Sequence, residues 1–274
     1  MNKSGSSPRL SGIRLHPIKS LDPVSVSEAR IGPNGGLELD RAWALYSVDG
    51  QWINAKRTAA VHLIRAAYAP GLTSVTLSVP GDLPDRQAGR RKIAPITLAF
   101  PGDTERAAEW FSAYCEQTVI VRYAREGFPD DGLAPGPTII STASLEAICS
   151  WFPGMTLDEA RQRFRTTLEI NEVPAFWEDQ LFGPNANYVV RFRIGEVAFE
   201  GSNPCARCPV PSRDPHTGAD IVGFQKRFSD LRLAQLPPWS PVERFDHFYR
   251  LATNTRVAST ESGKLLRLGD PVSL

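Results

Sequence analysis

The sequence predicts a mainly β fold of the α+β class, built from two modules. Most apolar segments are short and alternate with polar residues, which is the pattern of half-buried strands. The 23 prolines and 21 glycines are scattered between these segments, where they favour turns. Strands and helices do not alternate regularly, which argues against a doubly wound parallel sheet. A chain of 274 residues is also long for a single core.

The composition limits the classes of partner. The formal net charge is +1, whereas binding to nucleic acid or to a membrane surface usually needs a basic excess. No segment approaches the roughly 18 apolar residues of a spanning helix. The polar leader 1–8 has no apolar signal-peptide core. Four cysteines do not make a disulfide framework in a chain of this size. We therefore expect a cytoplasmic protein with free thiols and no nucleic-acid or membrane partner.

The first module is assigned to residues 9–125 and is expected to consist of short strands around one hairpin. Residues 39–46 and 51–54 carry aromatic side chains on either side of Asp49-Gly50, a pair typical of a type I′ turn. The other expected elements are strands over 9–15, 24–29, 61–68, 74–79, 96–100 and 119–123, an exposed loop over 80–93 and a helix over 104–115.

The second module is assigned to residues 126–274. It follows the segment 125–137, which is rich in Gly, Pro and Asp and is expected to be a linker. Helices are expected from a cap at Ser141 or Thr142 to about residue 151, over 156–164 and over 221–235. Strands are expected over 166–170, 188–194, 197–200 and 247–253.

The most reactive side chains lie in the segment Asn-Pro-Cys-Ala-Arg-Cys-Pro at 203–209, which we expect to be a stiff loop. Cys205 and Cys208 have the spacing of half a zinc site. The same spacing occurs in thioredoxin-type dithiols, and a single thiolate also suits a soft metal or a cofactor. Arg207 stands between the two cysteines and would favour a thiolate. On spacing alone these three interpretations remain open.

Other residues bear on the choice among the three interpretations of the cysteine pair. Cys115 and Cys149 are solitary on helical segments, where a cysteine is usually a small buried hydrophobe, so a second zinc-binding pair is missing. The prolines after the pair do not continue as the helix that a thioredoxin-type motif opens. The four histidines have no metal-cluster spacing, and we interpret them as surface or turn residues: His16, His62, His216 and His247.

Three residues of the first module are candidates for binding an anion. Lys19 and Ser20 follow the first expected strand, and Arg41 precedes the hairpin. A point charge, a neutral donor and a forked guanidinium are what a phosphate group requires. Arg165, between a helix and a strand, is a similar candidate. The competing interpretation is that each is a solvated surface cation.

Several short motifs follow one another from about residue 9 to residue 274. They are His-Pro-Ile-Lys-Ser at 16–20, Leu-Asp-Arg-Ala-Trp at 39–43, Ser-Thr-Ala-Ser-Leu at 141–145, Arg-Phe-Arg at 163–165, Trp-Glu-Asp at 177–179, Pro-Cys-Ala-Arg-Cys at 204–208, Asp-Pro-His-Thr-Gly at 214–218 and Gly-Asp-Pro-Val at 269–272. In this order they resemble the MOSC family, in the branch that carries a MOSC N-terminal β-domain before the MOSC β-barrel domain.

The resemblance implies molybdenum cofactor (molybdopterin). In the branch that includes the mitochondrial amidoxime-reducing component and its bacterial relatives, the second cysteine of the pair ligates molybdenum, which implies this role for Cys208. The cofactor's pterin and phosphate would be held by Lys19, Ser20 and Arg41. The arginine of the family's Phe-Arg-Pro-Asn motif corresponds to Arg165.

This chain departs from the family pattern at two places. The family's Arg-Pro-Asn is Arg165-Thr166-Thr167 here, so the asparagine contact is lost or replaced by the Thr167 hydroxyl. The serine between the family's two cysteines is Ala206, which removes a hydroxyl near the metal. We count Thr167 and Arg207 with the cofactor-binding residues.

The resemblance implies a reductase of small N-hydroxylated or N-oxide compounds that depends on molybdenum cofactor. Electrons would come from a separate donor protein, because we expect no iron–sulfur module in this chain. Pyridoxal phosphate is a further family-level association, although we expect the chain to lack the long pyridoxal-phosphate domain of molybdenum-cofactor sulfurases. The alternative is a non-catalytic carrier of the cofactor or of sulfur, with Cys208 as the persulfide. A structural zinc protein is the third hypothesis.

Overall fold

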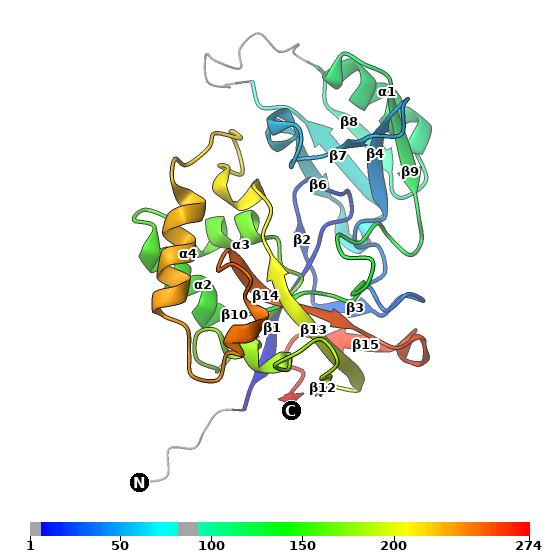
Figure 1. Cartoon of the computed structure of the whole chain (residues 1–274). Coiled ribbons are helices and arrows are strands. Elements are labelled where there is room, and N and C mark those ends of the chain that lie inside the picture. The colour runs from blue at the N-terminus through cyan, green and yellow to red at the C-terminus, as the bar shows by residue number, and fades with distance from the viewer. Residues whose placement is uncertain (1–6, 82–92) are drawn as a thin grey trace.

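The computed structural model describes residues 7–81 and 93–274 as a mainly β protein with four α-helices in those ranges, which confirms the predicted fold class (Figure 1). Most of the leader 1–8 and of the loop expected over 80–93 lies outside the described residues. No helix in the described part of the chain is long and apolar enough to cross a membrane.

An eight-stranded sheet forms the lower half of the molecule in Figure 1. Its strands run in the order β16 (Val272–Ser273), β12 (Val190–Ile194), β13 (Val197–Ala206), β14 (Arg250–Arg256), β10 (Ile139–Ser141), β11 (Leu168–Asn171), β1 (Arg9–Leu15) and β2 (Val24–Ser25). Only β10 and β11 are parallel neighbours; the other pairs are antiparallel. The N-terminal strand β1 therefore belongs to a sheet whose other long strands come from the second half of the chain.

Two three-stranded sheets form the upper half. One has the order β5 (Trp52–Ile53), β4 (Trp43–Ser47) and β9 (Val119–Tyr123), and the other β6 (Arg65–Tyr68), β7 (Ser74–Ser78) and β8 (Ile96–Ala99). Helix α1 (Thr104–Cys115) packs against β9, with Trp110, Phe111 and Tyr114 buried. A two-stranded ribbon of β3 (Glu28–Arg30) and β15 (Leu265–Arg267) joins the start of the chain to its end.

The hairpin predicted around Asp49-Gly50 is present, but its turn differs from the predicted one. Ser47 donates its N–H to the carbonyl of Gln51, and the Gly50 N–H donates to the carbonyl of Ser47, so residues 48–50 form the loop. Gly50 has a φ of 73°, and Asp49 has no positive φ. A type I′ turn needs positive φ at both central residues, so that prediction is wrong; a three-residue loop ending in a left-handed glycine takes its place.

Helices α2 (Thr142–Trp151), α3 (Leu157–Phe164) and α4 (Phe224–Ala234) lie together beside the large sheet (Figure 1). The first two begin where the sequence predicted. Ser141 accepts the N–H of the third residue of α2, and Thr156 does the same for α3. Each cap satisfies a backbone donor that a helix end would otherwise leave unpaired.

Some elements differ from their predicted boundaries because they pair with distant segments. The strand expected over 61–68 begins with a 3-10 helix, Ala59–Leu63, and the strand expected over 24–29 is interrupted. Strand β13 was expected to end at residue 200 but continues to Ala206, so Cys205 lies in a strand and not on a loop. Its register with β14 shifts on both sides of the Pro204 pair. Such bulges accommodate a proline, which has no N–H to donate to the sheet.

One hydrophobic core spans both halves of the chain. Leu10 and Ile13 of β1, Trp43 of β4 and Val272 of β16 belong to the same buried cluster. A second cluster lies among α2, α3 and α4 and is rich in aromatic rings. The predicted boundary between residues 125 and 126 stays a prediction.

Candidate functional site

One cavity of about 510 Å³ gathers the side chains that the sequence singled out. Its lining residues come from the turn after β1, from the segments before and after the β4–β5 hairpin, from the 125–137 segment, and from the chain following α3 and β13. The predicted site residues on its wall are Lys19, Ser20, Arg41, Arg165, Thr167, Arg207 and Cys208. The structure thus brings all seven together, while the roles assigned to them stay predictions.

The backbone fixes the cationic end of the cavity. The Lys19 N–H donates to the carbonyl of Trp43 at 2.8 Å, and the Arg41 N–H donates to the carbonyl of His16 at 2.9 Å. Ser20 and Arg41 have φ values of 77° and 52°, a left-handed conformation that costs free energy in a residue with a β-carbon. Such conformations persist where the surrounding structure enforces them, and they concentrate at functional sites.

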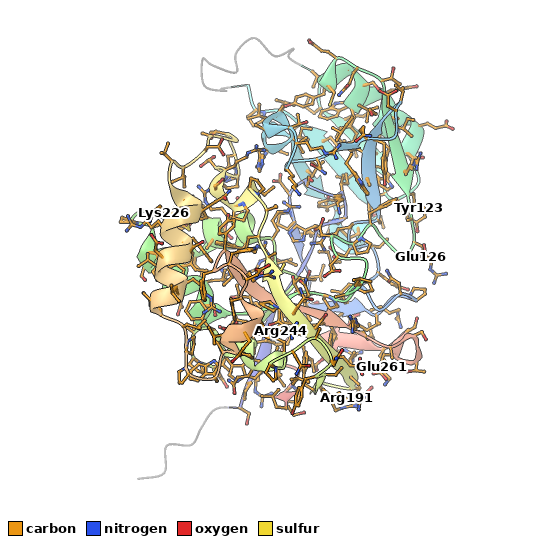
Figure 2. The ribbon with its side chains drawn as sticks, in the orientation of Figure 1. Tyr123, Glu126, Arg191, Lys226, Arg244 and Glu261 are labelled. Carbon is orange, nitrogen blue, oxygen red and sulfur yellow. The ribbon has the colours of Figure 1, made fainter. Side chains whose placement is uncertain are left out.

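Lys19 and Arg41 are not solvated surface cations. Arg191 and Lys226, which point away from the molecule in Figure 2, have side chains that are 80% and 82% exposed. The side chains of Lys19 and Arg41 are only 12% and 15% exposed. Burial lowers the pKa of Lys19, because it disfavours the charged form, although Asp130 opposes the shift. Two partly buried cations at one end of a cavity are suited to an anionic group.

Two carboxylates hold these cations. Asp130 Oδ1 lies 2.6 Å from Lys19 Nζ, and Asp130 Oδ2 lies 3.3 Å from Arg41 Nε. Arg41 also forms an ion pair with Asp40. Burial acts to lower the pKa of Arg41, but the two carboxylates outweigh it and raise that pKa. Desolvation by the surrounding atoms acts to raise the pKa of Asp130, although its side chain is 70% exposed, but Arg41 and Lys19 outweigh it and hold that pKa below its ordinary value.

Arg165 and Thr167 line the cavity after α3. Arg165 caps that helix in the left-handed conformation, with a φ of 51°, and its Nη2 donates to the carbonyl of Leu21 at 2.7 Å. Burial, reinforced by the positive charge of Arg41, lowers the pKa of Arg165 to about 10. Thr167 is 1% exposed, and its Oγ1 has no hydrogen-bond partner. A buried hydroxyl without a partner is costly, so this atom is available to a ligand.

Both thiols line the cavity, at and just beyond the end of β13. Cys205 is in the strand, Cys208 is in the segment that follows, and both are free and half-buried. Arg207 Nη1 lies 3.1 Å from Cys205 Sγ, and its other guanidinium nitrogen donates to the carbonyl of Phe164. The arginine between the two cysteines is therefore fixed on Cys205, which leaves Cys208 as the thiol without that contact.

The geometry bears on the two competing interpretations of the pair. The residues after Cys208 form a short 3-10 helix, Val210–Ser212, so the pair does not open an α-helix as a thioredoxin-type dithiol does. Within residues 7–81 and 93–274, no group of three or more His, Cys, Asp or Glu side chains is arranged to hold a metal ion. Neither finding bears against a single thiolate ligand.

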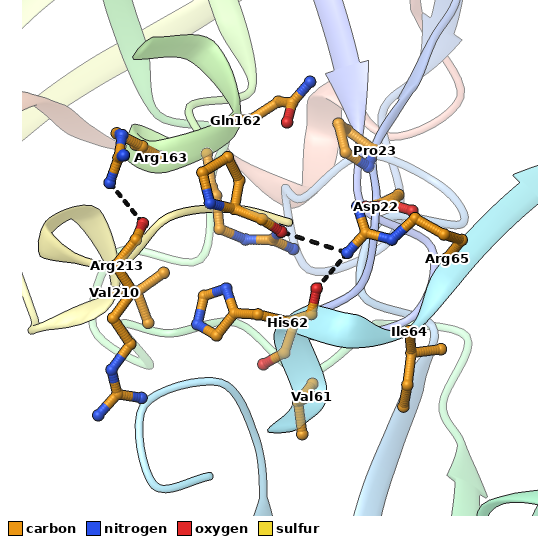
Figure 3. A pocket seen from close by; sticks show the side chains of 13 residues that line it. Asp22, Pro23, Val61, His62, Ile64, Arg65, Gln162, Arg163, Val210 and Arg213 are labelled. Atoms are coloured by element: carbon orange, nitrogen blue, oxygen red, sulfur yellow. Dashed lines mark hydrogen bonds and ion pairs between the residues drawn. The ribbon is translucent and has the colours of Figure 1, made fainter. Parts of the chain in front are cut away.

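Ser20 and Arg165 also line a second, small cavity of about 20 Å³, and this cavity corrects the prediction for the histidines (Figure 3). His62 lines it and is 7% exposed, and His16 is 1% exposed, so neither is a surface residue. Burial and the charges of Arg165 and Arg213 lower the pKa of His62 to about 4. His216 and His247 are exposed, as predicted.

The sequence did not reveal Asp40 and Asp130 as parts of the site. Asp40 adjoins Arg41 in the predicted hairpin motif, which is a signal that was present in the sequence. Asp130 lies in the segment taken for a linker, just after the chain leaves Tyr123 and passes Glu126 (Figure 2). An acidic residue in a Pro- and Gly-rich segment is usually solvated, and only the tertiary structure places this one on two cations.

The fold and the site together define a mainly β protein with a cavity that is lined by two thiols and by several cations. Residues 7–118 match the model of the MOSC N-terminal beta barrel domain. This match covers the first part of the chain and agrees with the resemblance to the MOSC family that the sequence motifs indicated.

The curated relatives are molybdenum cofactor sulfurases. The protein of that name from Drosophila grimshawi is 24% identical over 241 residues, which cover 77% of this chain and 29% of the relative. The one from Danio rerio is 24% identical over 267 residues, covering 84% of this chain and 31% of the relative. The chain thus spans about a third of the length of the relatives it matches.

Among solved structures, the YUAD protein from Bacillus subtilis aligns with 97% of this chain and 94% of its own, at 10% identity and a TM-score of 0.35. A similarity at that level carries no conclusion about this protein.

Proposed function

We propose that this protein binds molybdenum cofactor in the 510 Å³ cavity and uses it to reduce small N-hydroxylated or N-oxide compounds. One observation carries the proposal: Cys208 and the three anion-binding candidates Lys19, Ser20 and Arg41 line the same cavity, although they are far apart in the sequence. The MOSC N-terminal domain and the relationship to molybdenum cofactor sulfurases support the choice of cofactor.

The residues present fit this cofactor chemically. A thiolate is a soft ligand of the kind that binds soft metals, and Cys208 supplies one. Lys19, Ser20 and Arg41 supply a point charge, a hydroxyl and a guanidinium for a phosphate. The unpartnered Thr167 Oγ1 offers a further hydrogen bond to a polar ring such as a pterin.

When bound, the cofactor supplies the two-electron redox chemistry, and the protein supplies ligation, orientation and electrostatics. In this assignment Cys208 holds the metal, and Lys19 and Arg41 neutralise the phosphate. Arg165 adds positive charge near Arg41. Electrons come from a separate donor protein, which reaches the site from solvent.

A second candidate function is a carrier of molybdenum cofactor or of sulfur that does not turn over a substrate. The observation that favours it is the name of the relatives, since a sulfurase handles sulfur for the cofactor. The contact of Arg207 with Cys205 would then leave Cys208 as the sulfur-bearing thiol.

Metal and pterin analysis of the purified protein tests the proposal. We expect molybdenum and pterin to be present in the wild type and in Cys149→Ser, but lost in Cys208→Ser. Cys149 is the matched control, because it is also free and half-buried but lies on α2 away from the cavity. Equal molybdenum in both variants would contradict the ligand assignment.

Activity then separates the two functions. Reduction of benzamidoxime by the loaded protein with a chemical electron donor supports the reductase. Loaded protein that does not reduce it supports the carrier.

A further inference from the structure

The two cations at the end of the cavity already hold an anion that belongs to the protein. The Asp130 carboxylate places one oxygen 2.6 Å from Lys19 Nζ and the other 3.3 Å from Arg41 Nε. Each oxygen thus contacts a different cation, and two oxygens of a phosphoryl group would make the same pair of contacts. A ligand phosphate and Asp130 therefore cannot both take these contacts.

Exposure indicates which of the three groups is able to move. The Asp130 side chain is 70% exposed, whereas Lys19 and Arg41 are 12% and 15% exposed. The segment around Asp130 has no regular secondary structure. On one side the Phe128 N–H donates to the carbonyl of Arg41 at 2.9 Å, and on the other the Asn254 side chain donates to the Asp131 carboxylate at 3.1 Å. A rotation of the Asp130 side chain is enough to break both ion pairs.

The cations keep other partners when Asp130 leaves. Lys19 Nζ donates to the carbonyl of Phe128 at 2.9 Å and lies over the ring of Trp52, 5.0 Å from its centroid. Arg41 keeps its ion pair with Asp40. The anion-binding arrangement is therefore preserved without Asp130, as a preorganised site requires.

We propose that Asp130 is an internal competitor for the anion subsite, which a phosphate-bearing ligand displaces on binding. The proposal rests on the proposed function, since the subsite is the one assigned there to the cofactor's phosphate. Displacement reduces the apparent affinity for every anion by one common factor, the fraction of molecules with Asp130 turned away. Weakly held monoanions then stay out of the site, while a dianion with further partners such as Ser20 still binds.

Binding of two small phosphate esters tests this by calorimetry. All three proteins compared carry Cys208→Ser, because we expect that variant to purify without the cofactor whose phosphate would occupy the subsite. Methyl phosphate is a dianion at pH 8, since the second pKa of such esters is about 6, and dimethyl phosphate is a monoanion of similar size. We expect Asp130→Asn to tighten both esters by the same factor, about tenfold, because it removes the competitor without adding contacts. If Asp130 merely repelled anions from a fixed position, the dianion would gain much more than the monoanion, and that result would overturn the proposal.

Asp131→Asn is the matched control. Asp131 lines the same cavity one residue away, and its carboxylate contacts Asn254 instead of the two cations. We expect less than a twofold change in binding of either ester to this variant. Equal tightening by both variants would show a general charge effect and would refute displacement. Equal binding of methyl phosphate to the parent protein and to both Asp variants would support the anion subsite and refute displacement of Asp130. No binding of methyl phosphate to any of them would contradict the anion subsite and the proposed function together.

Discussion

At the scale of single residues, the site combines strained backbone with unsatisfied polar groups. Arg41 and Arg165 both have left-handed backbone conformations, and both guanidinium groups line the cavity. Thr167 Oγ1 is buried beside them with no partner. Each feature costs stability in the protein alone, and a ligand that forms a hydrogen bond with Thr167 Oγ1 would recover part of the cost of the unpaired hydroxyl.

Thr167→Val tests whether the orphaned hydroxyl serves a ligand. Valine has nearly the same shape and no hydroxyl, so the variant removes an unsatisfied buried polar atom. In protein without the cofactor we expect a gain of about 1 kcal/mol in the free energy of unfolding, measured by urea denaturation. We also expect several-fold less molybdenum and pterin to co-purify.

Thr166→Val controls for the substitution itself. Thr166 is also buried, at 3% exposure, but it does not line the cavity. Unchanged cofactor content in Thr167→Val, or an equal loss in Thr166→Val, would show that the Thr167 hydroxyl makes no contact with the ligand.

The sequence located the cations and thiols by chemical type and by motif order, but it did not locate their partners. Lys19 and Arg41 stood in recognisable motifs at strand ends. Asp130 is 111 residues from Lys19 in the sequence, and no local pattern connects the two. Ion pairs of this kind depend on how segments distant in the sequence pack together, and the periodicity and spacing of residues do not predict that packing.

At the scale of elements, local signals predicted those elements whose stability is local. Helices α1 and α3 and the hairpin at Gly50 have caps, turn residues or regular apolar spacing within a few residues. Strand β10 has only three residues, and it exists because it pairs with β11 and β14. The last part of β13, up to Ala206, likewise depends on bulged pairing with β14. The local prolines favoured a loop there, so the sequence did not predict this part of the strand.

The 3-10 helix Trp177–Leu181 carries a buried acid whose protonation affects stability. Glu178 is fully buried; Ser141 and Ser144 donate to its Oε2, while Oε1 has no partner. Burial, with the adjacent charge of Asp179, raises the pKa of Glu178 to about 7. The folded state therefore binds this proton more tightly than the unfolded state, whose glutamate pKa is about 4.3. Its contribution is most favourable below about pH 4.3 and declines as the pH rises to 7.

Glu178→Gln should therefore be more stable than the wild type at pH 8, by about 2 kcal/mol, and nearly equal to it at pH 4.5. Urea denaturation at the two pH values measures this difference. Glu169→Gln is the contrasting variant, because Arg161 and Arg14 bind the buried Glu169 and outweigh burial to lower its pKa. That variant should be less stable than the wild type at pH 8. A loss of stability in Glu178→Gln at pH 8 would mean that the Glu178 carboxylate is stabilising in its charged form.

At the scale of the whole molecule, the large sheet and the cavity both depend on the two ends of the chain. Strand β1 fills the sheet position between β11 and β2, and its Leu10 and Ile13 are buried in the common core. The N–H of Val272 donates to the carbonyl of Pro8 at 2.8 Å, and Arg9 forms an antiparallel bridge with Pro271, so the first and last strands of the chain lie beside each other. The turn that carries Lys19 follows directly from β1, and this couples the cationic end of the site to the sheet that carries Cys208.

This arrangement predicts how the second module behaves when it is produced alone. Residues 126–274 lack β1, so the edge of β11 and the apolar surface that covers Leu10 and Ile13 would be exposed. We expect this fragment to aggregate or to lack a cooperative unfolding transition. A permuted fragment, with residues 7–16 joined after Leu274 by a short Gly-Ser linker, should regain cooperative unfolding, because the linker has only to connect two adjacent antiparallel segments. The same permutant with Leu10→Asp should not regain it, since a charge would replace a buried apolar side chain. A cooperative transition in the fragment without β1, measured by circular dichroism during heating, would show instead that residues 126–274 form an independent domain.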